Sequence, residues 1–348
     1  MAIYKIFDDG NDVISNVKDT VSSGMWENGS GTLTAFYTSS TQSGSSGEHY
    51  LDVYGSAATT TTRKPQFSVA YGHFNGSGSL GRIGVDGNRA AASVYRQLSQ
   101  TLLGPTETQF TFAGTGGNIT PKFVYAISVA REFLREKMDP GNWELHISSG
   151  SRSIRLIDDS DANINPQLGN TKREFNVVSG SVANGVHTTA STTATSTNSG
   201  SYGLFYPELG MIILNPNSLA SGSVNTCESA FIEPLVRSTG TNDLNHRKLL
   251  KSIESGSYFS ARREEQKRSS FYFCDVLAGE FNHSQNPSFF TGSNAELVNN
   301  SFKREPTTYI TTVGLYNDNN ELLAVAKMSK PFKKDANTEA LIKVRLDY

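Results

Sequence analysis

Short β-prone runs separated by stretches of serine, threonine and glycine most constrain how this chain can fold. Three such runs, at residues 33–37, 50–54 and 67–71, are divided by the polar stretches TSSTQSGSSGEH and GSAATTTTRKP. Serine, threonine and glycine are typical of turns and solvated strand faces. Hydrophobic residues make up 36 % of the chain and charged residues only 18 %, which excludes a coiled coil. A net charge of −2 and 10 % aromatic residues argue against a disordered chain.

Helical periodicity is clearest over residues 88–103. Apolar residues recur there at spacings of three and four, and Gly104-Pro105 follows. A second helix is predicted over 243–254, where Asp243 is a favourable N-cap and Gly256 ends the pattern. The polar segment 13–21 and the charged segment 130–138 are further predicted helices.

Strand signals are best in the last ninety residues. They occupy 270–277, 309–316, 322–328 and 340–346, and the polar turn 317–320 joins the second to the third. Further strands are expected at 2–7, from residue 123, at 211–214 and in a hairpin of 143–147 with 154–157. The predicted fold class is therefore α+β, mainly β, with antiparallel sheets, about three helices and a β-rich C-terminal module.

Composition divides the chain into three predicted regions. Residues 1–157 form an N-terminal mixed β/α region, and residues 204–348 form the C-terminal β-rich assembly module. Between them, residues 158–203 include TTASTTATSTNSGS, which has little to bury and is expected to be a long loop or insertion.

Two sequence motifs resemble ligand-binding patterns, but neither has the full pattern. Gly76-Ser-Gly78-Ser-Leu-Gly81 matches a dinucleotide pattern, but the predicted helix starts several residues too late, so a loop is favoured. Residues 158–163 alternate oxygen ligands as a calcium loop does, yet the required Gly and Glu are missing, which leaves at most a weak ion site.

Histidine and cysteine spacing gives no metal or nucleophile signature. The six histidines are scattered, and Cys227 and Cys274 are far apart, so reduced thiols are expected. No catalytic residue, metal or cofactor is therefore predicted, and the chain is not expected to be an enzyme. No apolar run approaches the length of a membrane span, and the N-terminus resembles neither a signal nor a transit peptide.

One charged cluster, Arg262-Arg263-Glu264-Glu265, mixes signs at adjacent positions. A solvated segment with local ion pairs is the first interpretation. A polar contact between subunits is the alternative, because arginine side chains bind carboxylates well at interfaces.

Several blocks resemble virion structural proteins of contractile-tailed bacteriophages of the T4-like and cyanophage type. The residues that carry the resemblance are 65–73, 138–143, 206–210, 280–288, 309–317 and 321–331. The final pair is also similar to a strand pair of phage tail and baseplate attachment domains. The resemblance implies a structural virion protein, a tail or baseplate subunit that is made in the host cytoplasm and ends in the virion.

The implied partners are other virion proteins, such as tail tube, sheath or baseplate wedge, in a multimeric particle. Direct nucleic-acid contact is not expected, because the chain lacks the concentrated positive charge that phosphate-backbone binding requires. A neck or capsid-surface position is a close variant. The segment 309–348 is suited to packing on, or adding strands to, a partner sheet, although an antiparallel core within one subunit is an alternative. The predicted interface residues are Arg262, Arg263, Glu264, Glu265, Tyr309, Tyr316, Phe332 and Tyr348.

Two rival functions remain open. A fibre-type receptor- or glycan-binding module would expose aromatic residues beside polar ones, and Tyr202, Phe205 and Tyr206 are its candidates. A phage-associated hydrolase would need two carboxylates in one cleft.

Overall fold

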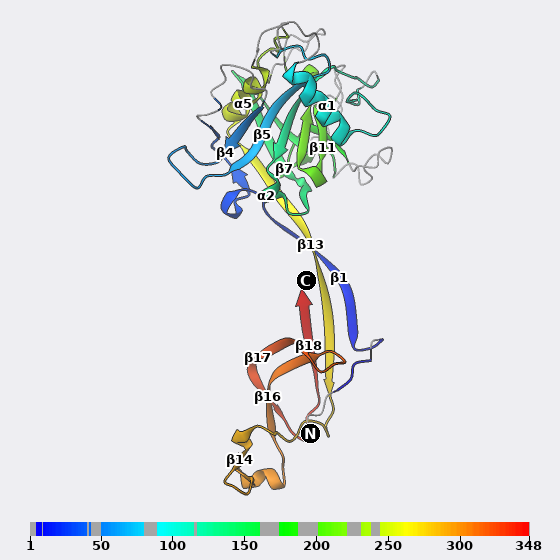
Figure 1. Cartoon of the computed structure of the whole chain (residues 1–348), viewed down its shortest axis with the longest axis vertical. Helices are drawn as coiled ribbons and strands as arrows, with labels where there is room; N and C mark the ends of the chain where they lie inside the picture. The colour runs from blue at the N-terminus through cyan, green and yellow to red at the C-terminus, as the bar shows by residue number, and fades with distance from the viewer. Residues whose placement is uncertain are drawn as a thin grey trace. The chain divides into compact units, whose positions relative to one another are not determined.

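The chain is described here from a computed structural model, over residues 5–8, 10–39, 42, 50–79, 89–114, 117–160, 174–186, 201–220, 231–237 and 244–347. It packs as two compact units (Figure 1). The smaller unit contains Met1–Asp19 and Gln266–Tyr348, and the larger unit contains Thr20–Glu265. These limits lie inside two strands, β1 (Val13–Gly24) and β13 (Phe259–Val276), and do not coincide with the predicted divisions at 157/158 and 203/204.

The larger unit is built on one antiparallel sheet. From β13 the strand order is β7, β8, β9, β11, β12, β6, β5, β4 and β3, while β2 pairs with β13 and β10 with β9. The bounds are β2 (Thr32–Leu33), β3 (Tyr37–Thr38), β4 (Tyr50–Tyr54), β5 (Pro65–His73), β6 (Phe123–Val129), β7 (Lys137–Ser149), β8 (Arg152–Asp158), β9 (Phe175–Ser181), β10 (Gly185–Val186), β11 (Gly203–Tyr206) and β12 (Met211–Leu214).

Alternating side chains give this sheet two apolar faces. On β6, Phe123, Tyr125, Ile127 and Val129 join one core, whereas the intervening Val124 and Ala126 join another. Successive side chains of a strand point to opposite faces, so a strand buried on both sides is apolar throughout.

Two helices cover the two faces. Helix α1 (Ala90–Leu102) packs on β5 and brings Tyr95, Leu98 and Leu102 to the smaller core. Helix α5 (Asn245–Gly256) packs on β7, β5 and β4 and brings Leu249, Leu250 and Ile253 to the larger one. Two single-turn helices, α2 (Arg131–Leu134) and α4 (Pro216–Leu219), and two 3₁₀ turns, η1 (Glu27–Gly29) and η2 (Pro207–Leu209), complete this unit.

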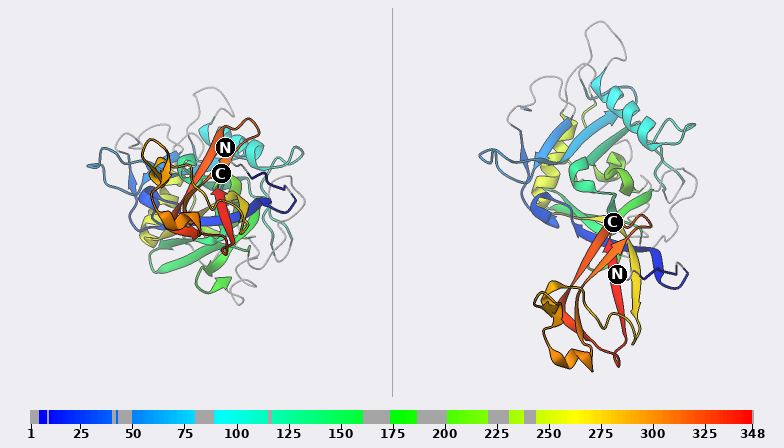
Figure 2. Two further views of the ribbon diagram at one scale, coloured as in Figure 1. Left: turned by 90° about the horizontal axis from the view of Figure 1, so that it is seen from below. Right: turned by 60° about the horizontal axis from the view of Figure 1, so that its bottom comes forward.

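The smaller unit contains the C-terminal strands. Within it β13 pairs with β18 (Ala340–Asp347), and β16 (Thr308–Tyr316) forms a hairpin with β17 (Leu322–Lys334), drawn in orange to red in Figure 2. The side-chain oxygen of Asn317 accepts hydrogen bonds from the backbone nitrogens of Asn319 and Glu321 and closes the predicted turn. The remaining elements are β14 (Phe290–Thr291), β15 (Glu296–Leu297), η3 (Pro287–Phe289) and η4 (Asn300–Lys303).

The structure confirms the mainly β, α+β class and corrects several local predictions. Residues 13–21 form the strand β1 rather than a helix, because β1 pairs with the edge of β13. Directly before β1, the amide of Phe273 in β13 donates to Asp12 O at 2.8 Å. The predicted helix over 130–138 ends at Leu134, because Arg135 has a φ of 55°. Lys137 is already the first residue of β7 and pairs with Glu264 of β13.

Two other predictions fall partly outside the described residues. Residues 5–7 of the expected strand 2–7 are not in a strand, and the other residues are not described. In the expected loop 158–203, residues 175–181 form the buried strand β9, because Phe175 and Val177 join the core between β8 and β11. Within the described ranges no helix is long and apolar enough to cross a membrane.

Candidate assembly surface

Most of the charged cluster at 262–265 is engaged inside the larger unit. Glu264 is buried and forms an ion pair with Lys137 at 2.9 Å, and Glu265 lies 3.7 Å from Arg135. The Glu264–Lys137 pair follows from the register of β13 on β7, in which the two residues face each other. Arg135 lies just before β7, directly after α2. Both pairs therefore join segments that are distant in sequence.

The two arginines of this cluster differ. Arg263 donates to Ser23 Oγ at 3.0 Å and to Phe133 O at 3.5 Å. Arg262 is exposed, at the point where the pairing of β13 with β7 shifts register. A bulge turns a side chain away from the regular sheet face, so Arg262 is the member of the cluster best placed to reach another molecule.

The aromatic candidates lie on the hairpin of the smaller unit. Tyr309 is 60 % exposed and Tyr316 is 43 % exposed, whereas Phe332 is half-buried. Tyr348 lies outside the described residues. The structure thus brings Tyr309, Tyr316 and Phe332 onto one two-stranded sheet.

An apolar patch occupies the turn end of that hairpin. A Cβ at Gly314 would lie 3.0 Å from the ring of Tyr316 and 3.2 Å from Leu322 Cδ1, so both side chains lie over this glycine. Val325 is the cross-strand partner of Gly314 and shares its face. We call Gly314, Tyr316, Leu322 and Val325 the hairpin patch; Leu322 and Val325 are 52 % and 58 % exposed, and the adjacent Leu323 is 68 % exposed.

Sequence reasoning missed the aliphatic members of the hairpin patch. The run Leu322-Leu323-Ala324-Val325 predicted the strand correctly, but an apolar run does not indicate which side chains will be covered. Leu315 is the buried residue of this region, at 6 % exposure. Because consecutive side chains alternate, Gly314 and Tyr316 then face the opposite side.

The backbone beside the hairpin patch is also available. Within the described part of the chain β16 and β17 pair only with each other, so each has an edge of unpaired backbone groups. Such an edge is a template for another strand unless charge or proline blocks it. Lys327, Lys330 and Pro331 occupy the far half of β17 and protect it, which leaves the turn end open.

The candidates of the glycan-binding hypothesis are core residues. Tyr202, Phe205 and Tyr206 are 6 %, 0 % and 1 % exposed. Phe205 packs against Trp143 with ring centroids 5.2 Å apart, and Tyr206 belongs to the core beneath α1. They form no exposed aromatic cluster.

The acidic turn after β8 uses its carboxylates on the protein itself. Asp158 accepts hydrogen bonds from the amides of Gly141 and Ser160, and Asp159 accepts from the backbone and side-chain nitrogens of Asn176. Burial raises the pKa of Asp158. Residues 161–163 of the candidate ion site lie outside the described residues.

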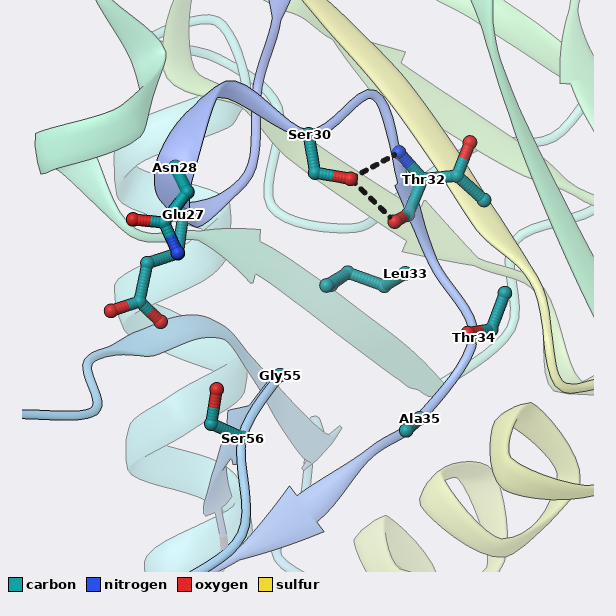
Figure 3. A pocket seen from close by; sticks show the side chains of 9 residues that line it. All are labelled: Glu27, Asn28, Ser30, Thr32, Leu33, Thr34, Ala35, Gly55 and Ser56. Carbon is teal, nitrogen blue, oxygen red and sulfur yellow. Dashed lines mark hydrogen bonds between the residues drawn. The ribbon is translucent and has the colours of Figure 1, made fainter. Parts of the chain in front are cut away.

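Two small pockets lie among the described residues of the larger unit. A shallow pocket of about 220 Å³ is lined by backbone and small polar side chains around Leu33 and Gly55 (Figure 3). Glu27 is its only titratable lining residue, and the Gln66 side chain already binds both its amide and its carboxylate. Ser30 Oγ is likewise occupied by the backbone of Thr32.

A second pocket, of about 110 Å³, lies beside Glu233 and Lys251, which pair with each other. Neither arrangement provides two free carboxylates facing one substrate.

His73, at the end of β5, is held in its neutral form. Burial, followed by the charges of Arg237, Lys122 and Arg89, lowers its pKa from 6.5 to about 4. Its Nδ1 accepts a hydrogen bond from the amide of Asn75 at 3.0 Å, which places the proton of the neutral ring on Nε2.

Acidification should therefore destabilise the larger unit through His73. The unfolded chain binds this proton near pH 6.5 and the folded chain near pH 4, so the unfolded state holds more protons between these values. The contribution of His73 to the free energy of unfolding is fully present above pH 6.5. It is lost as the pH falls toward 4, by up to about 3 kcal/mol.

Denaturant unfolding of wild type and His73→Gln across this pH window measures the effect. The difference between the two unfolding free energies should change with pH across this window. A constant difference for His73→Gln would contradict the assignment.

Comparison with known proteins adds no relative to this description. No protein-family model matches the chain, and searches of curated proteins and of solved structures find no match either.

Proposed function

We propose that this chain is a structural virion protein of a tailed phage, a tail or baseplate subunit that joins its neighbours through non-covalent contacts. The observation that carries the proposal is the hairpin patch: exposed apolar side chains beside an unpaired strand edge. In a particle, such a surface is covered by the neighbouring subunit. Position in the neck or on the capsid surface is the close alternative.

The chemistry of the patch favours one kind of partner. An extended segment can add to the open edge by backbone hydrogen bonds while its apolar side chains contact Leu322 and Val325. Lys327 and Lys330, exposed on the same strand, favour acidic residues at one end of that segment. We therefore propose a strand of a neighbouring virion protein, apolar in the middle and acidic at one end.

Cross-linking mass spectrometry on intact particles of the phage tests the position. Exposed Lys327, Lys330 and Lys333 should cross-link to tube, sheath or wedge proteins, whereas Lys334, which is fully buried, should not react. Cross-links to neck or capsid proteins would place the chain there instead. Absence of the chain from particles would contradict the proposal.

Val325→Asp is expected to block assembly without unfolding the chain. Val325 is 58 % exposed, so the substitution should change the free energy of unfolding by no more than about 1 kcal/mol. A carboxylate in a dry apolar contact costs more than about 1.4 kcal/mol, so incorporation should fall at least about tenfold. Complementation of a phage lacking the gene, with particle content measured by mass spectrometry, gives this number.

Val298→Asp is the matched control. Val298 belongs to the same unit and is 60 % exposed, but it lies outside the hairpin. It should be incorporated like wild type. Equal incorporation of the two variants would remove the hairpin patch from the proposed interface.

A further inference from the structure

A cationic cluster, separate from the hairpin patch, surrounds the end of β5 in the larger unit. His73 and Phe123 are register partners on β5 and β6, and their rings stack with centroids 6.0 Å apart. The guanidinium of Arg237 lies over the Phe123 ring, 5.0 Å from its centroid. Lys122 directly precedes Phe123, and its side chain is exposed. These residues bring two full positive charges beside a neutral imidazole.

The third cation is held in place by the glycine turn after β5. Gly76 and Gly78 have φ values of 80° and 82°, which glycine adopts without strain. A Cβ at Gly76 would lie 2.6 Å from Arg89 Cβ, so the turn packs directly against Arg89, the residue before α1. The turn that resembles a dinucleotide motif thus packs against Arg89, the N-cap residue of α1, and its Ser79 Oγ accepts a hydrogen bond from the amide of Ala91 at 3.1 Å.

This cluster lacks negative charge among the described residues. Arg89, Lys122 and Arg237 form no ion pair there, in contrast to Lys137, Lys251 and Arg345, which each have a carboxylate partner. The three border the end of β5: Arg237 lies over the Phe123 ring, Lys122 precedes that residue, and Arg89 packs against the turn. After burial, their charges contribute to the low pKa of His73. Like charges gathered at one place repel, and an anion bound between them would remove that cost.

We propose that Arg89, Lys122 and Arg237 form a binding site for a multiply charged phosphate, free or esterified. Guanidinium groups bind phosphate oxygens through paired N–H donors, and an ammonium group adds a point charge. The neutral His73 can add an Nε2–H donor. Three cations match a phosphate dianion or pyrophosphate better than a single carboxylate, so the charge of the ligand is part of the proposal.

Calorimetric titration of the full chain with inorganic pyrophosphate, at neutral pH and low ionic strength, tests the site. Arg237→Gln should weaken binding at least about tenfold, the usual size of a lost charge-assisted contact. Arg262→Gln is the control, since Arg262 is an exposed arginine of the same unit outside the cluster, and it should bind like wild type. Acetate should not compete.

A second readout follows His73 itself. Bound phosphate opposes the three cations, so saturating pyrophosphate should raise the pKa of His73 from about 4, as measured by NMR of the imidazole. A mononucleotide in place of pyrophosphate distinguishes an esterified from a free phosphate.

Three results would overturn the proposal. They are no pyrophosphate binding, equal binding by Arg237→Gln and Arg262→Gln, and competition by acetate at the same concentration as pyrophosphate. Much tighter binding of a single-stranded oligonucleotide, with the same dependence on Arg237, would replace the small ligand by a nucleic acid. None of these outcomes bears on the hairpin patch, so the two proposals are tested separately.

Discussion

Lys334→Met is expected to destabilise the smaller unit by about 2–4 kcal/mol. Lys334 is fully buried at the end of β17, and its ammonium group donates to Ala278 O, Asn282 Oδ1 and Asp335 O, each at 2.8 Å. An ammonium group has three donors, and all three are used. Methionine keeps the length of the apolar stem but leaves these acceptors without their donor.

The neighbouring lysine provides the control. Lys333 is exposed and lies 3.4 Å from Asp335 Oδ2, and a surface ion pair of this kind contributes about 0–1 kcal/mol. Lys333→Met should therefore change stability little. Similar losses for the two variants would show that the buried ammonium does not hold the 278–282 segment to β17.

The measurement has to report on the correct unit. Both tryptophans, Trp26 and Trp143, lie in the larger unit, so their fluorescence does not follow the smaller one. Hydrogen exchange of the amides of β16 and β17, read by mass spectrometry, does follow it. Faster exchange confined to these strands in Lys334→Met is the expected result.

Trp26→Ala is expected to cost the larger unit about 3–5 kcal/mol. Trp26 is 1 % exposed, and its ring lies 4.9 Å from Phe259 and 6.1 Å from Phe67, centroid to centroid. Its Nε1 donates to Phe259 O at 3.1 Å. The substitution removes packing from two strands of the core at once and leaves a carbonyl without this donor.

Two further variants separate these contributions. Trp26→Phe keeps an aromatic ring and loses the Nε1 donor, so a smaller loss, of about 1–2 kcal/mol, is expected. Tyr37→Ala, at a residue that is 41 % exposed, should cost less than either change at Trp26. Denaturant unfolding followed by the fluorescence of Trp143 measures all three, and equal losses at Trp26 and Tyr37 would contradict the structure.

Local sequence patterns predicted an element correctly wherever one hydrophobic periodicity or one turn type dominates the segment. The spacing of Ala91, Tyr95, Leu98 and Leu102 predicted α1, and the structure places the helix over Ala90–Leu102. The polar turn at 317–320 predicted the β16–β17 hairpin, because Asn side chains bind their own backbone in tight turns. The strands 50–54, 67–71 and 211–214 were found from β-branched and aromatic runs.

Contacts between segments far apart in the sequence explain the local predictions that the structure corrected. Residues 13–21 contain helix-compatible polar residues, yet they form β1, since β13, more than 240 positions later, supplies the backbone partners. The mixed-sign charge pattern likewise favoured a solvated segment at 262–265, whereas the register on β7 gives Glu264 a partner at Lys137. Glu265 in turn lies 3.7 Å from Arg135, just before β7. No local signal reports a partner so far away along the chain.

The sequence by itself determined the mainly β class, the principal helices and the C-terminal hairpin, because these depend on residue periodicity and turn chemistry within a few positions. Only the tertiary structure decided which side chains are exposed. It buried Tyr202, Phe205 and Tyr206, and it left Leu322 and Val325 open on the hairpin patch. It also gathered Arg89, Lys122 and Arg237 from distant segments at the end of β5. Burial and charge proximity depend on which strands pair, and that is a property of the whole chain.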